Sequence, residues 1–358
     1  MNQGEKQEIL FIAPCLRSGG AERVMVLLAN ELVKKDKKVR FAFTMDTVQA
    51  YTLDEKIDII INDGNRSPLG QIIFLRTLLK AYKYSTFISF FTYQNIYTLI
   101  ANSFLGRKIV VSERNDPAKT VYGKKSMIFL RNIFYNFASK IVFQTQEAME
   151  YFSMSIQKRG CIICNPLNSE LCKIYEGEKE KRIVAVARLN KQKNLPMMLK
   201  GVSTILKKYK EYVFELYGES DPRAESIKPQ LEELVFDLEI CNQVKFMGFQ
   251  SDVTDKISKA ALYINSSDYE GISNAMLEAI ALGIPCVCTD CPVGGARMFI
   301  RDGINGYLVS VGDEKGFELA IEKVLVNKDI YASSRKEGKN LRERLSVDKI
   351  IGQWLDIL

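Results

Sequence analysis

Two glutamates eight positions apart lie in the segment SSDYEGISNAMLEAIALGIP, residues 266–285. Glu270 precedes a predicted helix, and Glu278 lies on it. Ser273 is a suitable N-cap for this helix, and Gly283 suits the position just beyond its end. A carboxylate placed in this way can accept two hydrogen bonds from vicinal hydroxyls, which sugars and ribose present. Glu278 has apolar neighbours and should need a polar partner; the alternative is that both are solvated surface residues.

Two cations in VARLNKQKN suit a diphosphate. Arg188 comes directly after a predicted strand, and Lys193 follows five residues later. Arginine presents a planar fork to phosphate oxygens, and lysine presents a point charge. Either residue could instead be a solvated charge, as we expect for Lys191.

A pair of glycines stands where the first predicted strand meets the first predicted helix. The sequence there is Ser18-Gly19-Gly20. Adjacent glycines leave backbone N–H groups uncovered at a helix N-terminus, which is a natural seat for a phosphate. A simple tight turn explains the pair about as well.

These residues sit within an alternation of short apolar strands and longer helical segments. The first series of predicted strands is Ile9–Ala13, Val39–Thr44, Ile57–Ile61, Phe87–Phe90, Ile109–Ser112 and Ile141–Phe143, and the second is Ile183–Ala187, Val213–Tyr217, Val244–Phe246, Ala261–Ile264, Cys286–Cys288 and Tyr307–Val309. Such alternation predicts two doubly wound parallel sheets. The polar stretch 168–181 between them predicts a linker. We therefore expect domains at 1–167 and 182–345, with a C-terminal helix at 346–358 packing back on the first.

Composition removes several classes of protein. The 358 residues are 47% apolar and 26% charged, which is typical of globular chains. There is no histidine, so histidine triads, His–Cys dyads and His-ligated zinc are excluded. The two CxxC pairs, Cys161/Cys164 and Cys288/Cys291, lie more than 120 residues apart, so we predict buried apolar cysteines and no metal site. The polar, acidic start and the lack of a long apolar run predict a cytoplasmic protein.

The net charge of +7 is unevenly distributed. Residues 1–170 carry +8 and residues 171–358 carry −1. Residues 107–140 hold eight Lys or Arg against two acids, interleaved with large apolar side chains. This pattern fits an interfacial helix on an anionic membrane. It also fits a core helix with a solvated polar side, which we slightly favour.

In series, these motifs resemble the GT-B fold retaining glycosyltransferases of family 4. The Glu-x7-Glu pair, the glycine loop with AERVMVLLANEL, VARLNKQKN, Asn165-Pro166 and CPVGGARMFIRDGINGYLV occur in matching order across nearly the whole chain. The resemblance implies an α/β, GT-B fold of two Rossmann-like domains facing a central cleft. It is greatest to bacterial enzymes that build capsule, O-antigen or other surface polysaccharides.

The resemblance also implies roles in donor binding. Arg188 and Lys193 would hold the diphosphate of a nucleotide sugar, expected to be a UDP-sugar. Glu278 would bind the ribose. Glu270 would contact the donor sugar together with the backbone N–H groups of Gly271, Ile272 and Ser273. Domain closure would bring the glycine loop, Gly19 and Gly20, to the diphosphate.

In this family the leaving phosphate oxygen is thought to take the acceptor's proton on the face where the new bond forms. The enzyme then mainly stabilises negative charge on the departing diphosphate. The catalytic residues would be Arg188, Lys193 and Glu270, with no metal and no cofactor, since the cations supply the positive charge.

Many relatives carry a histidine in the acceptor loop, where this chain has SERNDP. Glu113, Arg114, Asn115 and Asp116 are therefore candidate contacts to a saccharide or polyprenyl-diphosphate-linked acceptor. A plain turn ending at Pro117 is the alternative. We expect no nucleic-acid partner. If the basic segment contacts the membrane, the enzyme is peripheral on the inner face of the plasma membrane.

Two other functions remain open at this point. One is a non-hydrolysing nucleotide-sugar epimerase, although those enzymes lack this arrangement and usually depend on histidine. The other is a catalytically silent nucleotide-sugar-binding partner subunit. The sugar, the linkage and the oligomeric state cannot be determined from the sequence.

Overall fold

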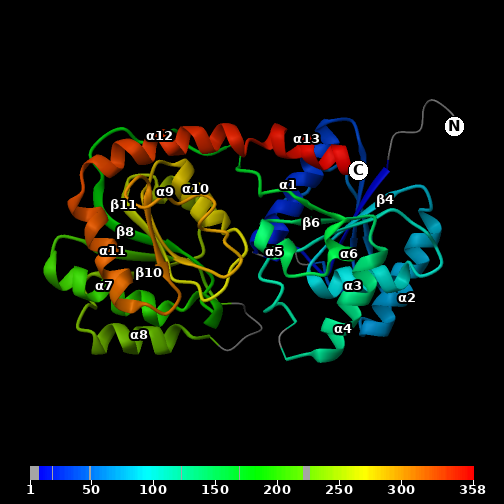
Figure 1. Cartoon of the computed structure of the whole chain (residues 1–358), viewed down its shortest axis with the longest axis horizontal. Coiled ribbons are helices and arrows are strands. Elements are labelled where there is room, and N and C mark those ends of the chain that lie inside the picture. The colour runs from blue at the N-terminus through cyan, green and yellow to red at the C-terminus, as the bar shows by residue number, and fades with distance from the viewer. Residues whose placement is uncertain (1–7, 18, 48–49, 122, 169, 221–225) are drawn as a thin grey trace. The chain divides into compact units, whose positions relative to one another are not determined.

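The computed structural model describes residues 8–17, 19–47, 50–121, 123–168, 170–220 and 226–358. These residues form two compact units. The first comprises the chain up to Pro166 together with Val347–Leu358, and the second is Leu167–Ser346. Each unit contains one parallel sheet with helices on both faces (Figure 1). The predicted pair of Rossmann-like α/β domains is confirmed.

The sheet of the first unit has the strand order β3-β2-β1-β4-β5-β6-β7, and every pairing is parallel. Its strands are β1 (Glu8–Ala13), β2 (Lys38–Phe43), β3 (Asp58–Ile61), β4 (Thr86–Phe90), β5 (Ile109–Ser112), β6 (Lys140–Phe143) and β7 (Gly160–Ile162). The central strands are almost entirely apolar and buried, because helices cover both faces of the sheet. The chain reverses its direction of winding between β1 and β4.

The helices of the first unit lie in two layers. Helices α1 (Gly20–Lys34) and α13 (Val347–Ile357) cover one face, and α2 (Pro68–Ala81), α3 (Thr92–Ala101) and α4 (Lys125–Phe134) cover the other (Figure 1). Three short elements complete the unit: η1 (Tyr135–Phe137), α5 (Gln146–Glu150) and α6 (Met154–Gln157).

The C-terminal helix α13 is held to the first unit by apolar packing and by charge. Trp354 is fully buried, and its ring stacks on Phe90 of β4 with centroids 5.9 Å apart. Near the start of the helix, Asp348 pairs with Lys35 at 2.9 Å. The last residues of the chain therefore contribute to the core below the carboxyl end of β4.

The sheet of the second unit has the order β10-β9-β8-β11-β12-β13, again all parallel. Its strands are β8 (Glu180–Val186), β9 (Val213–Tyr217), β10 (Val244–Gly248), β11 (Ala260–Asn265), β12 (Cys286–Asp290) and β13 (Gly306–Ser310). Its helices are η2 (Lys191–Lys193), α7 (Leu195–Lys208), α8 (Lys228–Asp237), α9 (Val253–Ile257), α10 (Asn274–Ala281), α11 (Glu314–Val326) and α12 (Asp329–Arg344). Here the winding reverses between β8 and β11.

Two details differ from expectation. Strand β8 begins at Glu180, inside the predicted linker. Arg182 pairs at 2.7 Å with Glu180 on the same strand and at 2.7 Å with Glu215 on the neighbouring strand β9. These ion pairs satisfy the charges within the sheet. The strand expected to bury Cys161 is the edge strand β7, which pairs only with β6, and Ile162 remains exposed. None of the helices in the described part of the chain is both long and apolar enough to cross a membrane.

Candidate functional site

The candidate donor residues of the second unit gather where its sheet reverses direction. Strands β8 and β11 are parallel neighbours, with Leu262 opposite Ile183, so the loops that follow them start from the same edge. One loop carries Arg188 and Lys193, and the other carries Glu270. Ligands of open α/β sheets bind outside the carboxyl ends of the strands at such a reversal.

Lys193 and Glu270, which lie 77 residues apart, form an ion pair. Their side chains are 11% and 20% exposed, so water only partly screens the charges. The Oγ of Ser267 lies 3.1 Å from the same carboxylate oxygen and 2.6 Å from Oδ1 of Asn265, so its one proton is shared between these two acceptors. A partly buried lysine and glutamate each need a partner to offset lost hydration, and here each finds it in the other. The pair places one positive and one negative charge side by side at this edge.

Further hydrogen bonds join the two loops on either side of this ion pair. Asn194 lies in the left-handed region, with φ 42°, and its Nδ2 donates to Oδ1 of Asp268 at 2.7 Å. Ser266 donates its hydroxyl proton to the carbonyl oxygen of Lys193 at 2.8 Å. Gln192 accepts at its carbonyl from the Asp268 N–H at 2.9 Å. Because the contacts come from backbone and side chains of both loops, the two loops behave as one structural element.

The predicted short helix is present as α10. Ser273 is its N-cap and accepts from the Met276 N–H at 3.4 Å, and Gly283 adopts the left-handed φ of 69° expected just after it. Glu278 is only 3% exposed, so it is not the solvated surface residue of the alternative hypothesis. Gly271, Ile272 and Ser273 are also buried, directly before the helix.

The backbone before α10 is packed tightly from behind. A Cβ atom added to Gly295 would come within 1.8 Å of the carbonyl oxygen of Gly271. Ser267 is held in a similar way, since its carbonyl accepts from Thr289 Oγ1 at 2.6 Å and from Cys291 Sγ at 3.2 Å. Sequence reasoning missed Thr289 and the position of Cys291, because nothing in the pattern indicated that the loop after β12 supports the loop after β11.

Arg188 differs from its predicted partners. It comes two residues after the end of β8 and is exposed, whereas Lys193 is buried. The structure therefore brings Lys193, Glu270 and the start of α10 together, and leaves the Arg188 side chain at the surface of the same edge.

In the first unit, the predicted glycine loop does open a helix. Gly19 is the N-cap of α1, with its carbonyl accepting from Tyr51 Oη at 3.2 Å. Ser18 lies outside the described residues. A Cβ atom on Gly19 would come within 2.0 Å of a carboxylate oxygen of Glu22, so this acid covers the glycine. Gly20 begins the helix and is exposed.

The SERNDP segment follows β5 and is held by a buried polar network. Glu113 is 2% exposed, and its carboxylate accepts from Tyr135 Oη and, at 3.1 Å, from Thr92 Oγ1. Burial raises the pKa of the Glu113 carboxyl, although the charge of Arg131 and both hydrogen bonds oppose that shift. The carboxylate oxygens are thus engaged within the unit.

The next three residues lead from β5 into a turn that begins at Pro117. Asp116 is buried and accepts from the Ala118 N–H at 2.8 Å, and Asn115 is half-buried. Arg114 lies over the Phe90 ring, with its Cζ 4.4 Å from the centroid, and donates from Nη1 to Oδ1 of Asn165 at 3.0 Å. The turn in this segment begins at Pro117, whereas the alternative interpretation had a turn that ends there. Arg114 points towards the carboxyl end of β4.

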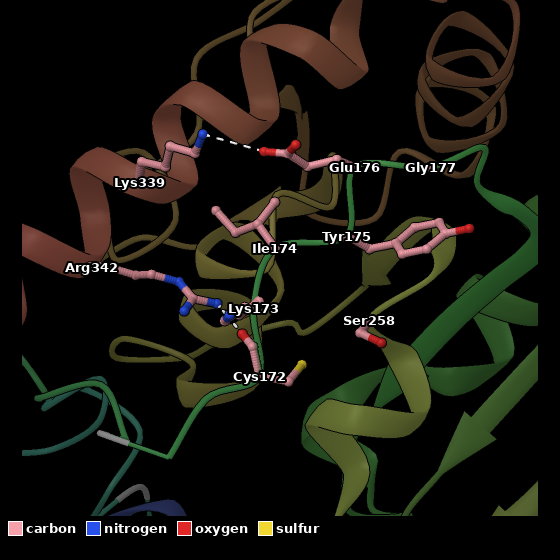
Figure 2. Close-up of a pocket in the computed structure, with 9 residues that line it drawn as sticks. All are labelled: Cys172, Lys173, Ile174, Tyr175, Glu176, Gly177, Ser258, Lys339 and Arg342. Carbon is pink, nitrogen blue, oxygen red and sulfur yellow. Dashed lines mark hydrogen bonds and ion pairs between the residues drawn. The ribbon is translucent and has the colours of Figure 1, made fainter.

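A cavity of about 700 Å³ lies elsewhere in the second unit (Figure 2). It is bounded by the segment 172–177, Ser258 and two cations of α12. Arg342 donates to the carbonyl oxygens of Ala281 and Cys172 at 2.7 and 2.6 Å, and Lys339 pairs with Glu176 at 3.5 Å. The predicted site residues do not line this cavity.

Comparison with known proteins places this geometry in a family context. Residues 180–327 match the family described as glycosyl transferases group 1. A Campylobacter jejuni protein is 28% identical over 364 residues, 98% of each chain; its name is GalNAc-alpha-(1->4)-GalNAc-alpha-(1->3)-diNAcBac-PP-undecaprenol alpha-1,4-N-acetyl-D-galactosaminyltransferase. The structure of Anabaena HepE in complex with UDP and glucose has a TM-score of 0.84 at 18% identity, covering 98% of each chain. The chain has the GT-B fold, and its second unit matches a glycosyltransferase family.

The chain also shares its fold with the lipopolysaccharide outer core galactosyltransferase WaaB in its apo form. The TM-score is 0.71 at 18% identity, with 98% of this chain and 99% of that chain covered. These similarities do not favour the epimerase or the silent binding subunit. The matched family segment contains Arg188, Lys193, Glu270 and Glu278.

We expect Gly295→Ala to destabilise the loop before α10. The new methyl group would displace the backbone at Gly271, and overpacking of this kind costs ~1–3 kcal/mol. Urea denaturation should show an earlier midpoint, and amide hydrogen exchange over 266–276 should be faster. Gly352→Ala is the control, since no atom lies within 4 Å of its added Cβ. Equal midpoints and equal exchange for the two variants would contradict this packing argument.

Proposed function

We propose that this protein is a retaining, metal-independent glycosyltransferase. It moves a sugar from a nucleotide-diphosphate sugar, most simply a UDP-sugar, to a saccharide or lipid-linked saccharide during synthesis of a bacterial surface glycan such as capsule or O-antigen. The observation that carries the proposal is the Lys193–Glu270 pair at the reversal of the second sheet, beside the N-terminus of α10 and the buried Glu278. The full-length similarity to a transferase named for an undecaprenol-linked substrate supports the acceptor class.

The residues of the second unit suit separate parts of the donor. Lys193 and the exposed Arg188 would hold the diphosphate, and Glu278 would bind the ribose hydroxyls. Glu270, with the backbone N–H groups at the start of α10, would contact the sugar. Lys193 already has a carboxylate partner, so its ammonium would be shared between Glu270 and a phosphate oxygen. A fixed cation is effective here because it needs little reorganisation when charge develops on the leaving group.

Proton transfer in this scheme uses the substrates. The acceptor hydroxyl attacks the anomeric carbon on the face from which the diphosphate leaves, and the departing phosphate oxygen takes the proton. The protein holds the reactants together and stabilises the new phosphate charge. This division of roles is compatible with a chain that contains no histidine.

In the first unit, Gly19 and Gly20 would let a phosphate approach the N-terminus of α1. The N–H of Gly19 itself donates to the carbonyl oxygen of Arg17 at 2.7 Å. For the acceptor, we propose that Asn115 and Arg114 make the direct contacts. Glu113 and Asp116 would hold the loop, since both carboxylates accept hydrogen bonds within the unit.

Helix α4 is a candidate contact with an anionic membrane. Its inner side packs on the core through Met127, Leu130 and Phe134. Its outer side, extended by η1, exposes Phe129, Ile133 and Phe137, which are 64%, 39% and 66% accessible. Lys124 and Lys125 at its start are exposed. The only acids in residues 107–140, Glu113 and Asp116, are buried, so the exposed charge of the segment is positive. Together these features suit an anionic lipid surface.

We expect Arg188→Ala and Lys193→Ala each to lower sugar transfer more than 10-fold, because each removes a charge-assisted contact to the diphosphate. Transfer is measured as UDP release from a panel of UDP-sugars with an acceptor extract. Lys191→Ala is the matched control, since Lys191 is exposed on the same short helix. Circular dichroism verifies folding. Unchanged turnover in both variants would contradict the diphosphate assignment.

Turnover should be insensitive to metal removal, since side-chain cations carry the diphosphate charge. Assays with and without excess EDTA should give rates within about twofold of each other, and NMR of the product should show the donor's anomeric configuration. Loss of activity in EDTA that Mg²⁺ restores would overturn metal independence. An inverted anomeric centre would overturn the retaining mechanism.

The double variant Phe129→Ser/Ile133→Ser should bind vesicles containing phosphatidylglycerol about 10-fold more weakly, because two partly inserted side chains are lost. Sedimentation with those vesicles and with pure phosphatidylcholine vesicles measures the effect. Phe236→Ser in the second unit is the control, since Phe236 is 72% exposed on α8. Binding that is equal for all variants, or absent in the native protein, would rule out α4 as a membrane contact.

A further inference from the structure

Arg114 is a cation without a carboxylate in the part of the chain that the structure describes. Its one hydrogen bond is the Nη1 contact to the neutral side chain of Asn165, at 3.0 Å. Its Cζ lies 4.4 Å from the Phe90 ring centroid and 5.7 Å from that of Trp354. Burial lowers the pKa of this guanidinium to about 9, and only the Cys164 thiol nearby favours the charged form.

The unused part of the guanidinium is its side-on edge. Nε and Nη2 are both buried and have no hydrogen-bond partner among the described residues. Nε1 of Trp354, also buried, likewise has none there. Folded proteins rarely leave buried N–H donors unsatisfied. The Nε–Nη2 edge is the one that forms two parallel hydrogen bonds to a phosphate or carboxylate.

Stacking and the C-terminal helix determine the direction of this edge. Trp354 stacks on Phe90 at 5.9 Å with an interplanar angle of 24°. Arg114 lies against both rings, and Asn165 holds Nη1. The helix that supplies Trp354 is tied down by the Asp348–Lys35 pair and by a hydrogen bond from Lys108 to the carbonyl oxygen of Leu358.

We propose that the Nε–Nη2 edge of Arg114 binds a phosphate oxygen pair of a diphosphate-linked acceptor, and that Trp354 is the positioning residue for that edge. This inference rests on the proposed function for the identity of the ligand. The two guanidinium nitrogens of this edge are donors without partners in the described structure. A phosphate offers two acceptor oxygens at the spacing that this edge requires. Because the two guanidinium nitrogens are enclosed, a neighbouring side chain must shift when the anion enters.

Trp354 is the only tryptophan in the chain, so its fluorescence reports on this place alone. The probe is inorganic pyrophosphate, added to the full-length protein in saturating UDP so that the nucleotide site is already filled. Geranyl diphosphate in a parallel titration tests whether a prenyl-linked diphosphate is accepted. We expect a saturable change in Trp354 emission with both ligands. Emission that does not change with either ligand, combined with no heat of binding by calorimetry, would overturn the proposal.

Substitutions of Arg114 separate the effect of the planar guanidinium edge from the effect of its positive charge. Arg114→Gln should weaken pyrophosphate binding at least 10-fold, since charge-assisted hydrogen bonds are lost. Arg114→Lys retains the charge without the side-on edge and should give an intermediate loss. Lys119→Gln removes an exposed charge from the same loop and should bind pyrophosphate within about twofold of native. An equal loss in Lys119→Gln, or none in Arg114→Gln, would show general electrostatic attraction instead of the fork.

Trp354→Phe tests positioning, with calorimetry in place of fluorescence. It keeps a ring beside Phe90 and should weaken pyrophosphate binding several-fold; in turnover assays it should raise the acceptor KM and leave the donor KM unchanged. A purely structural role would lower thermal stability with both KM values unchanged, and would overturn the positioning role. The pyrophosphate titration involves no sugar transfer. Pyrophosphate binding at Arg114 without transfer from any nucleotide sugar would therefore count against the proposed function alone. Sugar transfer without pyrophosphate binding at Arg114 would count against this inference alone.

Discussion

The carboxyl edge of the sheet in the second unit depends on the pairing of Lys193 with Glu270. Neither charge is fully hydrated, and each would be costly to bury alone. The pair survives only while the loops after β8 and β11 keep their conformations. Asn194 in its left-handed conformation, bonded to Asp268, and Ser266, bonded to the backbone of Lys193, maintain them. A cation at this edge is therefore in place before any ligand arrives, which is the arrangement that electrostatic stabilisation of a leaving group requires.

The first unit uses buried charge in a different way. Glu113 is satisfied by Tyr135 and Thr92 and anchors the segment after β5 to the helical layer. Arg114, the next residue, has aromatic neighbours and one amide oxygen, so its charge is not neutralised within the described residues. An anchored acid followed by an uncompensated cation leaves an anion as the chemically suitable partner for this loop. In this unit, as in the second, the residues offered to ligands follow the carboxyl ends of parallel strands.

Much of the architecture could be predicted because parallel sheets covered on both faces require continuous apolar strands separated by amphipathic helices. The alternation gave the predicted strands, and Ser273 and Gly283 marked the ends of α10. The start of β8 was predicted too late and the burial of Cys161 on β7 was overestimated, for two different physical reasons. Charged residues can extend a strand when neighbouring strands pair them, as Arg182 and Glu215 do, and an edge strand is not buried on every side.

The sequence by itself determined which residue types were available: no histidine, a pair of glutamates on and before one short helix, and cations after one strand. The sequence suffices for these features because residue type and local spacing determine helix capping, hydrophobic periodicity and the distribution of charge. The tertiary structure alone decided that Lys193 contacts Glu270, that Glu113 is buried, and that Trp354 from the last helix lies against Arg114. Contacts between residues 21 to 240 positions apart depend on strand order and packing, which local spacing does not encode.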